Sequence, residues 1–240
     1  MTTTPTTADR TALVTGASRG LGHALAAELN RCGWRLVLDA RDAGRLAGSV
    51  TALTHPELVA AVPGDVADPD HRAALAAAVG PRLDLLVNNA SDLGPSPLPP
   101  LAELGPGALR RIIEVNAVAP LALLQALLPA LHAAGGRIVD VTSDAAVEPY
   151  AGWGGYGASK AALDLLTAVL AVEHPELRVY AFDPGDMATE MHQAAFPGED
   201  ISDRPAPATV VPALLTLVDG ELPSGRYRAA DLPVATGAAR

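Results

Sequence analysis

The sequence predicts a doubly wound α/β fold, in which a parallel sheet of seven strands carries helices on both faces. Three observations lead to this fold. Short apolar segments alternate with helical segments along the 240 residues. The strand segments are apolar almost throughout, as in sheets covered on both sides. No repeat or linker divides the chain, and its length suits one large domain, expected over residues 10–240.

The first half of the chain supplies four of the predicted strands. They are short apolar segments: Thr11–Thr15, Arg35–Asp39, Leu58–Val62 and Leu83–Val87. An amphipathic helix is expected over Leu21–Cys32, ending at Gly33, and another over His71–Val79. Residues 1–9 are polar and rich in threonine, so we expect a flexible N-terminal tail there.

The second half continues the alternation. Three further strands are predicted over Arg137–Thr142, Arg178–Phe182 and Gly225–Ala229. A long helix over about residues 107–132 should be interrupted or kinked near Pro120 and Pro129, because proline removes a backbone hydrogen bond. Further helices are expected over Tyr156–Glu173 and Thr209–Val218.

Composition argues against several kinds of partner. A formal net charge of −10 disfavours nucleic acid and anionic membranes, which bind basic surfaces. No run of 18 or more apolar residues predicts a transmembrane helix, so no membrane association is expected. The single cysteine, Cys32, indicates a reducing compartment, and we expect a buried side chain and a cytoplasmic protein.

A glycine-rich loop follows the first predicted strand and opens the first helix. Its glycines, Gly16, Gly20 and Gly22, follow the spacing Gly-x-x-x-Gly-x-Gly. Such a loop lets the backbone approach a diphosphate, which binds at the positive end of the helix. The alternative is an ordinary glycine-rich turn, but the position between strand and helix favours a nucleotide.

The end of the second strand should select the nucleotide. An acidic residue at the ribose-facing position would bind the hydroxyls of NAD and repel a 2′-phosphate. We expect Ala40 at that position, next to Arg41 and close to Arg19 of the glycine loop. Two guanidinium groups bind a phosphate well, which predicts NADP(H). The alternative is that Asp39 binds NAD(H) and both arginines are solvated.

Three side chains suggest proton transfer. Tyr156 and Lys160 lie four residues apart and share one face of a helix, and Ser143 follows the fifth strand. Converging on one point, they would move a proton to or from a substrate oxygen. Alone, each has a structural explanation: Ser143 as a turn cap, Tyr156 as an interface aromatic and Lys160 as a surface charge.

Together these motifs make the whole chain resemble the short-chain dehydrogenase/reductase family, in its single-domain form with a Rossmann-like fold. Besides the glycine loop, Asp65 matches the acidic residue that binds near the adenine. Asn88-Asn89-Ala90 matches the family's Asn-Asn-Ala-Gly motif, with Ser91 where glycine is usual. Four residues match the family's catalytic tetrad: Asn116, Ser143, Tyr156 and Lys160.

The resemblance implies a role for each member of the tetrad. Tyr156 would be the general acid in reduction and the general base in oxidation. Ser143 would orient the carbonyl, and Lys160 would bind the nicotinamide ribose and lower the pKa of Tyr156, which is about 10 in a free tyrosine. Asn116 would hold a water molecule that connects Lys160 to solvent.

The resemblance also implies the cofactor-binding residues. They come from the glycine loop, the strand ends and the segment after the sixth strand: Gly16, Ser18, Arg19, Gly20, Leu21, Gly22, Arg41, Asp65, Val66, Asn88, Ala90, Tyr156, Lys160, Pro184, Gly185, Met187 and Thr189.

The substrate is expected to be a small carbonyl compound or alcohol. In the family, the segment over residues 186–207 is a lid, and its Met187, Met191 and Phe196 would line an apolar pocket or pack only on neighbouring helices. Tyr150 and Trp153 are candidates for one wall. The six histidines lack metal-site spacing, so no metal is predicted. Family members also suggest a homodimer or homotetramer.

The predicted function is therefore NADP(H)-dependent oxidoreduction, in which a ketone or aldehyde is reduced or a secondary alcohol is oxidised. One alternative is an enzyme that uses the same fold and cofactor for a non-redox result, as a dehydratase or an epimerase does. Another is a binding protein that senses NADP(H) without catalysis; loss of the tyrosine or lysine would be expected there, and both are present.

Overall fold

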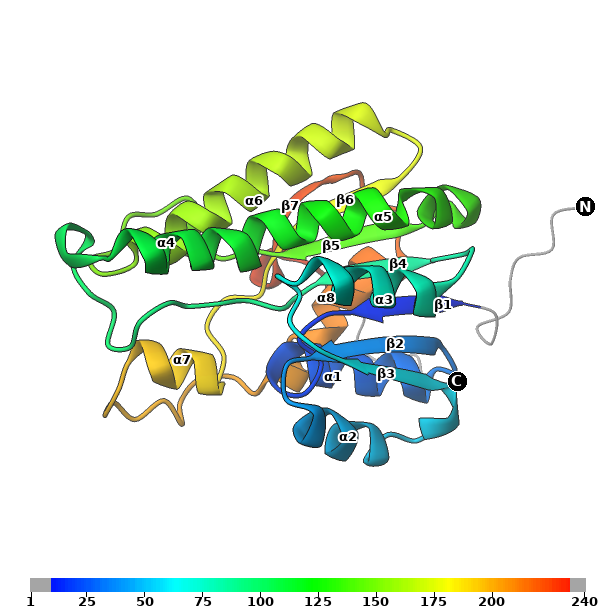
Figure 1. Cartoon of the computed structure of the whole chain (residues 1–240), viewed down its shortest axis with the longest axis horizontal. Coiled ribbons are helices and arrows are strands. Elements are labelled where there is room, and N and C mark those ends of the chain that lie inside the picture. Colours follow the sequence, from blue (N-terminus) through cyan, green and yellow to red (C-terminus); the bar gives the residue numbers. More distant parts are fainter. Residues whose placement is uncertain (1–9, 234–240) are drawn as a thin grey trace, which may run out of the picture.

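The structure, a computed structural model, describes residues 10–233 and has one sheet with helices on both faces (Figure 1). The strand order is β3-β2-β1-β4-β5-β6-β7, and every neighbouring pair is parallel. This confirms the predicted fold class. The winding direction reverses between β1 and β4, which is where ligands bind in such sheets. The predicted tail over residues 1–9 and the last residues of the predicted domain lie outside the described range.

All seven predicted strands are present, with ends that differ from the predicted ones by at most two residues. Their bounds are β1 Thr11–Val14, β2 Arg35–Ala40, β3 Val59–Pro63, β4 Leu85–Asn88, β5 Arg137–Val141, β6 Arg178–Asp183 and β7 Gly225–Arg228.

Eight α-helices connect or follow the strands in the described part of the chain. Their bounds are α1 Gly20–Arg31, α2 Ala43–Thr51, α3 Pro69–Val79, α4 Pro106–Ile113, α5 Ala119–Ala134, α6 Gly154–Glu173, α7 Glu190–Ala195 and α8 Val211–Asp219. Single 3₁₀ turns lie at Pro56–Leu58, Leu101–Glu103, Asp144–Ala146, Pro207–Thr209 and Ala229–Asp231.

The sequence analysis missed α2. The Asp42 side chain caps this helix by accepting a hydrogen bond of 2.9 Å from the backbone N–H of Arg45. Leu46 is the only residue of this short helix that is buried. Because α2 follows β2 directly, it brings a further arginine close to the predicted nucleotide site.

The long helix is interrupted at one of the two expected places. A π-helical segment, Glu114–Val118, joins α4 to α5 just ahead of Pro120. Near Pro129 the helix is not interrupted, because α5 continues to Ala134, and the alternative of a kink there stays a prediction. π-helical segments often occur at functional sites, and this one contains Asn116.

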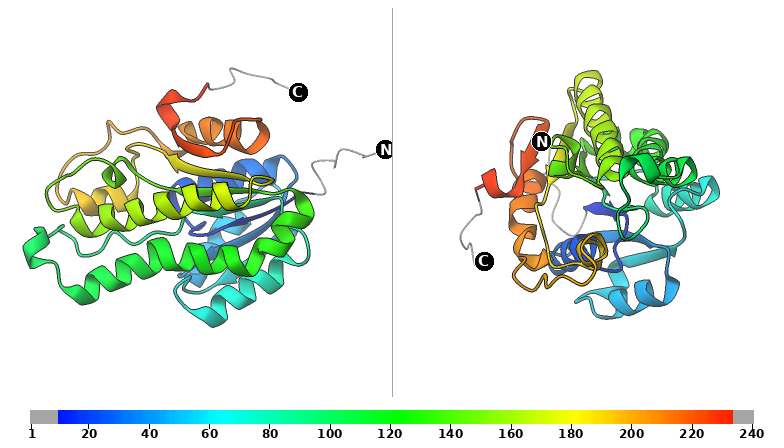
Figure 2. Two further views of the ribbon diagram at one scale, coloured as in Figure 1. Left: turned by 90° about the horizontal axis from the view of Figure 1, so that it is seen from above. Right: turned by 90° about the vertical axis from the view of Figure 1, so that its left-hand side faces the viewer.

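The central strands pack on both sides, which explains their apolar sequences, whereas the edge strands β3 and β7 are partly exposed. In β1, Ala12 and Val14 face the layer of α1 and α8, whereas Leu13 faces the layer of α3, α5 and α6. Figure 2 shows these two layers from above and from the side. Burial of one leucine contributes about 1.5–3 kcal/mol, so these two apolar layers hold the sheet and its strand ends in place.

Two helical stretches, Pro106–Ala134 and Gly154–Glu173, are long and apolar enough to cross a membrane by length and composition. About half of each is buried inside the domain, where Leu123, Leu127 and Leu170 pack toward the sheet. Helices that cover a sheet share these properties, so the two stretches are weak evidence of membrane insertion.

Cys32 is exposed, so the expectation of a buried side chain is wrong. α1 ends at Arg31 after packing Leu25 and Leu29 against the sheet, and Cys32 is the residue that follows the helix. Its sulfur lies 3.9 Å from a carboxylate oxygen of Glu28.

Candidate active site

A cavity of about 1100 Å³ opens at the carboxyl ends of the strands. Its size suits a dinucleotide together with a small substrate. Ser143, Tyr156 and Lys160 line it. So do all the predicted cofactor residues except Gly22 and Asn88. The fold therefore brings together residues that are far apart in the sequence.

The glycine loop fits the close approach of a diphosphate. Gly16 and Gly20 have φ values of +67° and +58°, which only glycine adopts easily. A Cβ atom on Gly16 would lie 2.9 Å from Cα of Ala90. The Asn89 side chain holds the loop by donating to the carbonyls of Thr15 at 2.9 Å and Gly16 at 3.2 Å. Because α1 begins at Gly20, its free N–H groups lie at the cavity.

Gly22 has a packing role. A Cβ atom there would lie 2.5 Å from Nδ2 of Asn89 and 2.6 Å from the carbonyl oxygen of Gly16. Gly22 therefore allows α1 to approach the loop and β4, although it does not line the cavity itself. Asn89, which the sequence analysis did not include among the cofactor residues, supports the loop from the other side.

Asn88 lies away from the cavity. Side chains alternate along a strand, and Asn88 at the end of β4 points toward α5 and α6. Its Nδ2 atom donates a 2.7 Å hydrogen bond to the buried carboxylate of Asp140. The structure therefore does not place Asn88 with the other predicted cofactor residues.

Asp39 is already engaged inside the protein. It is only 1% exposed, and its carboxylate accepts a 2.7 Å hydrogen bond from His71 Nε2 and a longer one, 3.4 Å, from Gly16 N–H. Burial raises the pKa of Asp39 to about 6, while the hydrogen bond from His71 opposes this rise. Asp39 lines the cavity, but both of its carboxylate oxygens already accept hydrogen bonds from the protein.

Three arginines line the neighbouring part of the cavity: Arg19, Arg41 and Arg45. The first two were predicted to bind the 2′-phosphate, whereas Arg45 lies on α2, the helix that the sequence analysis missed. Arg19 and Arg45 both contact the carboxylate of Glu190, the first residue of α7. Glu190 thus connects the segment over residues 186–207 to the arginine group.

The other predicted cofactor residues form the remaining walls. Asp65 accepts a 2.9 Å hydrogen bond from the N–H of Ala67 and pairs with Arg111. The hydroxyl of Thr189 caps α7 by accepting from His192 N–H at 3.1 Å. The remaining predicted cofactor residues also line the cavity: Ser18, Leu21, Val66, Ala90, Pro184, Gly185 and Met187.

Lys160 is held beneath the cavity. Its side chain is 2% exposed, and Nζ donates a 2.7 Å hydrogen bond to the carbonyl of Val141 in β5. Nζ lies 5.6 Å from the centre of the Tyr156 ring. Burial lowers the pKa of Lys160 to about 8, and the carboxylates of Asp140 and Asp164 oppose this shift. The ammonium group is therefore charged at neutral pH.

Tyr156 is also buried, on the same helix. Burial raises the pKa of Tyr156 to about 12, and the hydroxyls of Ser91 and Ser143 oppose this rise. The net direction is opposite to the one that the family resemblance implies, because burial outweighs both hydroxyls. A phenol in this state keeps its proton at neutral pH.

Ser143 is both the cap of a turn and a residue of the candidate active site. Its hydroxyl donates to Asp144 at 3.0 Å and accepts from the N–H of Ala145 at 3.2 Å, so it caps the turn after β5. It also lines the cavity close to Tyr156. The cap fixes the position of the hydroxyl.

Asn116 is fully buried in the π-helical segment. Its amide nitrogen donates to the carbonyl of Asp92 and the hydroxyl of Ser159, each at 2.9 Å. Its oxygen accepts from the N–H of Asp92 at 2.7 Å and from Ser91 Oγ at 3.2 Å. These four bonds use the whole capacity of the side-chain amide and link the loop after β4 to α6. The expected water molecule would therefore have to bind the backbone carbonyl of Asn116, and this role stays a prediction.

Apolar side chains pack beside the ring of Tyr156. The ring of Trp153 meets the ring of Tyr156 edge-on at 5.6 Å between centres, and Phe196 lies 6.0 Å from Trp153. Met191 and Leu93 join the same cluster. All the predicted pocket residues line the cavity: Tyr150, Trp153, Met187, Met191 and Phe196.

Comparison with known proteins agrees with this geometry. The family model described as short chain dehydrogenase matches residues 10–200. The chain belongs to the short-chain dehydrogenase/reductase family. The short chain dehydrogenase asqE of Emericella nidulans is 37% identical over 177 residues, which cover 69% of this chain and 65% of that protein, just under two thirds of its length.

Fuller matches come from two other members of this family. The uncharacterized oxidoreductase YciK of Escherichia coli K12 is 33% identical over 222 residues, covering 88% of this chain and 86% of that one. A short chain dehydrogenase of Shigella flexneri 2a strain 301, crystallised with NADP, superposes with a TM-score of 0.85 at 31% identity. That superposition covers 92% of this chain and 97% of the other.

Proposed function

We propose that this short-chain dehydrogenase is an NADP(H)-dependent oxidoreductase that reduces a ketone or aldehyde, or oxidises a secondary alcohol. The observation that carries the proposal is the placement of Tyr156, Ser143 and Lys160 in one cavity with the glycine loop. The neighbour from Shigella flexneri, which was crystallised with NADP, supports the choice of cofactor.

The residues present fit such a cofactor. The loop from Gly16 to Gly22 would offer backbone N–H groups to the diphosphate, and Asp65 and Val66, which line the same cavity, would bind the adenine. Pro184, Gly185, Met187 and Thr189 would contact the nicotinamide end, and Lys160 its ribose. When bound, NADPH supplies the hydride that the protein side chains cannot.

NADP(H) is favoured over NAD(H) by the groups at the end of β2. Asp39 is buried and bonded to His71, so it offers little to the ribose hydroxyls. Arg19, Arg41 and Arg45 provide positive charge around the same place. A 2′-phosphate would be attracted to this group, because guanidinium donors bind phosphate strongly.

The protein would contribute the proton. A phenol whose pKa lies near 12 stays protonated at neutral pH, so Tyr156 can donate its proton to a carbonyl oxygen. The oxygen of Ser143 is positioned by the N–H of Ala145, and its proton would turn from Asp144 to donate a hydrogen bond to the same substrate oxygen. The charged Lys160 would stabilise the phenolate that forms. A pKa raised to about 12 makes Tyr156 a weaker acid than a free tyrosine, so proton donation would depend on stabilisation of the phenolate by Lys160.

The pocket chemistry indicates the kind of substrate. Trp153, Phe196 and Met191 present apolar surface next to Tyr156, so the carbonyl of the substrate would carry an apolar group. The segment over residues 186–207 supplies two of these side chains, and we propose that it acts as the lid over the substrate. A hydrogen bond of 2.6 Å from Ser96 Oγ to the carbonyl of Ala194 connects it to the loop after β4.

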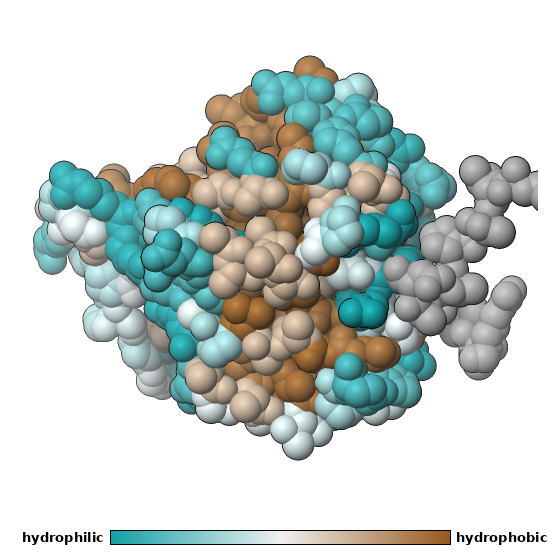
Figure 3. Space-filling model, turned by 45° about the vertical axis from the view of Figure 1, so that its right-hand side comes forward, coloured by the Kyte–Doolittle hydropathy of each residue, from teal (hydrophilic) through white to brown (hydrophobic). Residues whose placement is uncertain are grey.

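An exposed apolar stripe supports the homo-oligomer that family membership suggests. It consists of four residues of α6: Leu165, Leu166, Val169 and Val172, which are 67%, 37%, 44% and 80% exposed. Figure 3 shows apolar surface at the top of the molecule, where α6 lies. We propose that this face pairs with a second copy, and a cytoplasmic location stays a prediction.

The test is turnover with a panel of ketones and aldehydes. Oxidation of NADPH, followed by its absorbance, with formation of the matching alcohol would support the proposal. Tight NADPH binding with no turnover across aliphatic, aromatic and cyclic carbonyl compounds would favour a nucleotide-sensing protein instead. Conversion of a substrate with no net change in NADPH would favour a dehydratase or an epimerase.

A further inference from the structure

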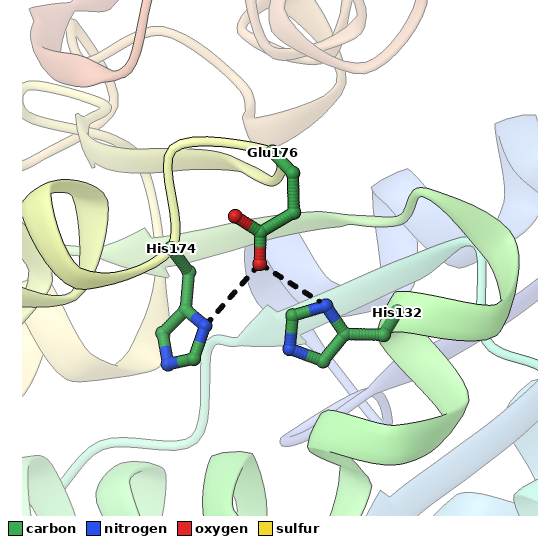
Figure 4. A group of neighbouring side chains, drawn as sticks. All are labelled: His132, His174 and Glu176. Carbon is green, nitrogen blue, oxygen red and sulfur yellow. Dashed lines mark hydrogen bonds and ion pairs between the residues drawn. The ribbon is translucent and has the colours of Figure 1, made fainter.

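Three side chains with metal-binding atoms meet at the end of the molecule opposite the cavity. His132 lies in the last turn of α5, His174 directly follows α6, and Glu176 lies in the turn that leads into β6 (Figure 4). One ligand atom from each residue lies within 4.8 Å of the others. Among the described residues this is the only such group of three. Only His174 and Glu176 are close to each other in the sequence, so residue spacing alone did not reveal the group of three.

The geometry of the group matches a tetrahedral ion. Nδ1 of His132 lies 3.2 Å from Oε1 of Glu176, and Nδ1 of His174 lies 3.4 Å from the same oxygen. An ion with ligands at about 2.0–2.1 Å keeps neighbouring ligand atoms roughly 3.3–3.4 Å apart in a tetrahedron. The two distances from the histidines to Glu176 therefore have the required length. The two imidazole nitrogens lie within 4.8 Å of each other and the ring centres are 5.2 Å apart, so an ion would have to draw the rings together to complete the tetrahedral spacing.

The backbone behind the three ligands is fixed. Leu131 and Leu177, the direct neighbours of His132 and Glu176, are both fully buried. The N–H of Leu177 bonds to the carbonyl of His174 at 3.0 Å, and the N–H of His174 bonds to Leu170 at 2.9 Å. A rigid frame that carries partly exposed side chains lowers the entropy lost when an ion binds.

We propose that His132, His174 and Glu176 bind a divalent transition-metal ion of the Zn²⁺ class. Two imidazoles and one carboxylate suit Zn²⁺ or Co²⁺ better than Mg²⁺ or Ca²⁺, which prefer oxygen ligands. Three protein ligands leave the fourth position to water. The ion joins the end of α5 to the turn between α6 and β6 and stabilises the folded chain, because the unfolded chain lacks the assembled site. The proposal does not depend on the proposed catalytic function.

The chain contains a matched control for this site. His55 and Glu57 repeat the His-x-Glu pattern, with Nδ1 of His55 also 3.2 Å from Oε1 of Glu57. No third metal-binding side chain joins them within the described part of the chain. A two-ligand pair of this kind should bind the ion far more weakly, so His55→Gln separates the proposed site from general binding to surface histidines.

The experiment is a Zn²⁺ titration of the full chain, stripped of metal and free of any histidine tag. We expect one ion per chain by calorimetry, and binding weaker by about tenfold or more in His132→Gln and in His174→Gln. His55→Gln should bind as the unmodified chain does. Zn²⁺ should raise the Tm of the unmodified chain and of His55→Gln, but not that of His132→Gln.

Two further measurements make the test specific. Co²⁺ in place of Zn²⁺ should give the intense visible absorption of a tetrahedral complex, and His174→Gln should abolish it. NADPH binding should be the same in all variants, which shows that they are folded. Equal Zn²⁺ affinity in the unmodified chain and in His132→Gln would overturn the proposal. So would the absence of saturable binding, since the three side chains would then form ion pairs only.

Discussion

Glu190 at the start of α7 is paired with Arg45 on α2: Nη1 of Arg45 lies 3.0 Å from one carboxylate oxygen and 3.1 Å from the other. Arg19 of the glycine loop contacts the same carboxylate. A single anionic side chain of the proposed lid therefore occupies two of the three guanidinium groups that we assign to the 2′-phosphate. The lid and the cofactor phosphate should compete for these groups.

Replacing Glu190 should consequently strengthen binding of NADPH. Glu190→Gln removes a negative charge and frees Arg19 and Arg45. Because exposed ion pairs contribute at most about 1 kcal/mol, we expect the Kd for NADPH to fall by roughly twofold to fivefold, with little change for NADH. Fluorescence titration measures both. Glu199→Gln, the same change at an exposed position of the same segment, should have no effect. Equal tightening in the two variants would refute the competition.

The arginine group should determine cofactor preference. Arg41→Ala removes a charged donor, and such hydrogen bonds contribute about 1.5–3 kcal/mol, so NADPH affinity should drop on the order of tenfold to a hundredfold. NADH affinity should stay nearly constant. Arg110→Ala, on the exposed side of α4, is the control and should leave both unchanged. An unaltered ratio of the two affinities in Arg41→Ala would remove this residue from the phosphate site.

The reductive rate should depend on pH through Lys160. The folded-state pKa of this lysine is lowered from 10.5 to about 8, so its positive charge is present below pH 8 and is lost as the pH rises through that value. Loss of the charge removes stabilisation of the phenolate formed at Tyr156. We expect kcat/KM for carbonyl reduction to decline above about pH 8. A profile that stays flat from about pH 7 to about pH 10 would show that Lys160 keeps its charge or is not needed.

Two glycine substitutions should have opposite effects on stability. Gly22→Ala would place a Cβ atom 2.5 Å from Asn89 Nδ2 and 2.6 Å from the Gly16 carbonyl, so it should destabilise the loop and weaken NADPH binding. Gly48→Ala, in α2, has no atom within 4 Å of the new methyl group. It should raise the free energy of unfolding by about 0.5–1 kcal/mol. Urea denaturation distinguishes the two, and a stabilised Gly22→Ala would contradict the packing described here.

The central strands were predictable because burial on both faces demands apolar residues, whereas the edge strands β3 and β7 are partly exposed. α2 was missed although Asp42 offers a capping signal, because only Leu46 of this helix is buried. Pro120 indicated an irregularity in the long helix but not its π-helical form around Asn116.

The candidate site also contains features that the sequence predicted and features that it did not. Nearly all the residues expected from the motifs and the family resemblance line the cavity, because strand ends converge at one edge of a parallel sheet. The sequence analysis did not predict that His71 of α3 forms a hydrogen bond with the carboxylate of Asp39 in β2. Nor did it predict the group of His132, His174 and Glu176, whose members come from separate elements. Such pairings depend on how the helices pack, which local sequence does not specify.

The proton donor is the central claim, and Tyr156→Phe tests it most directly. The variant keeps the ring that packs against Trp153 but has no proton to give. Tyr227→Phe, whose hydroxyl bonds to the carbonyl of Pro223 outside the cavity, is the matched control. The rate of NADPH-dependent carbonyl reduction and the Kd for NADPH are measured for both. We predict a loss of rate on the order of 10²–10⁴-fold in Tyr156→Phe with nearly unchanged NADPH binding, and a normal rate in the control. A rate in Tyr156→Phe close to that of the unmodified chain would contradict the account.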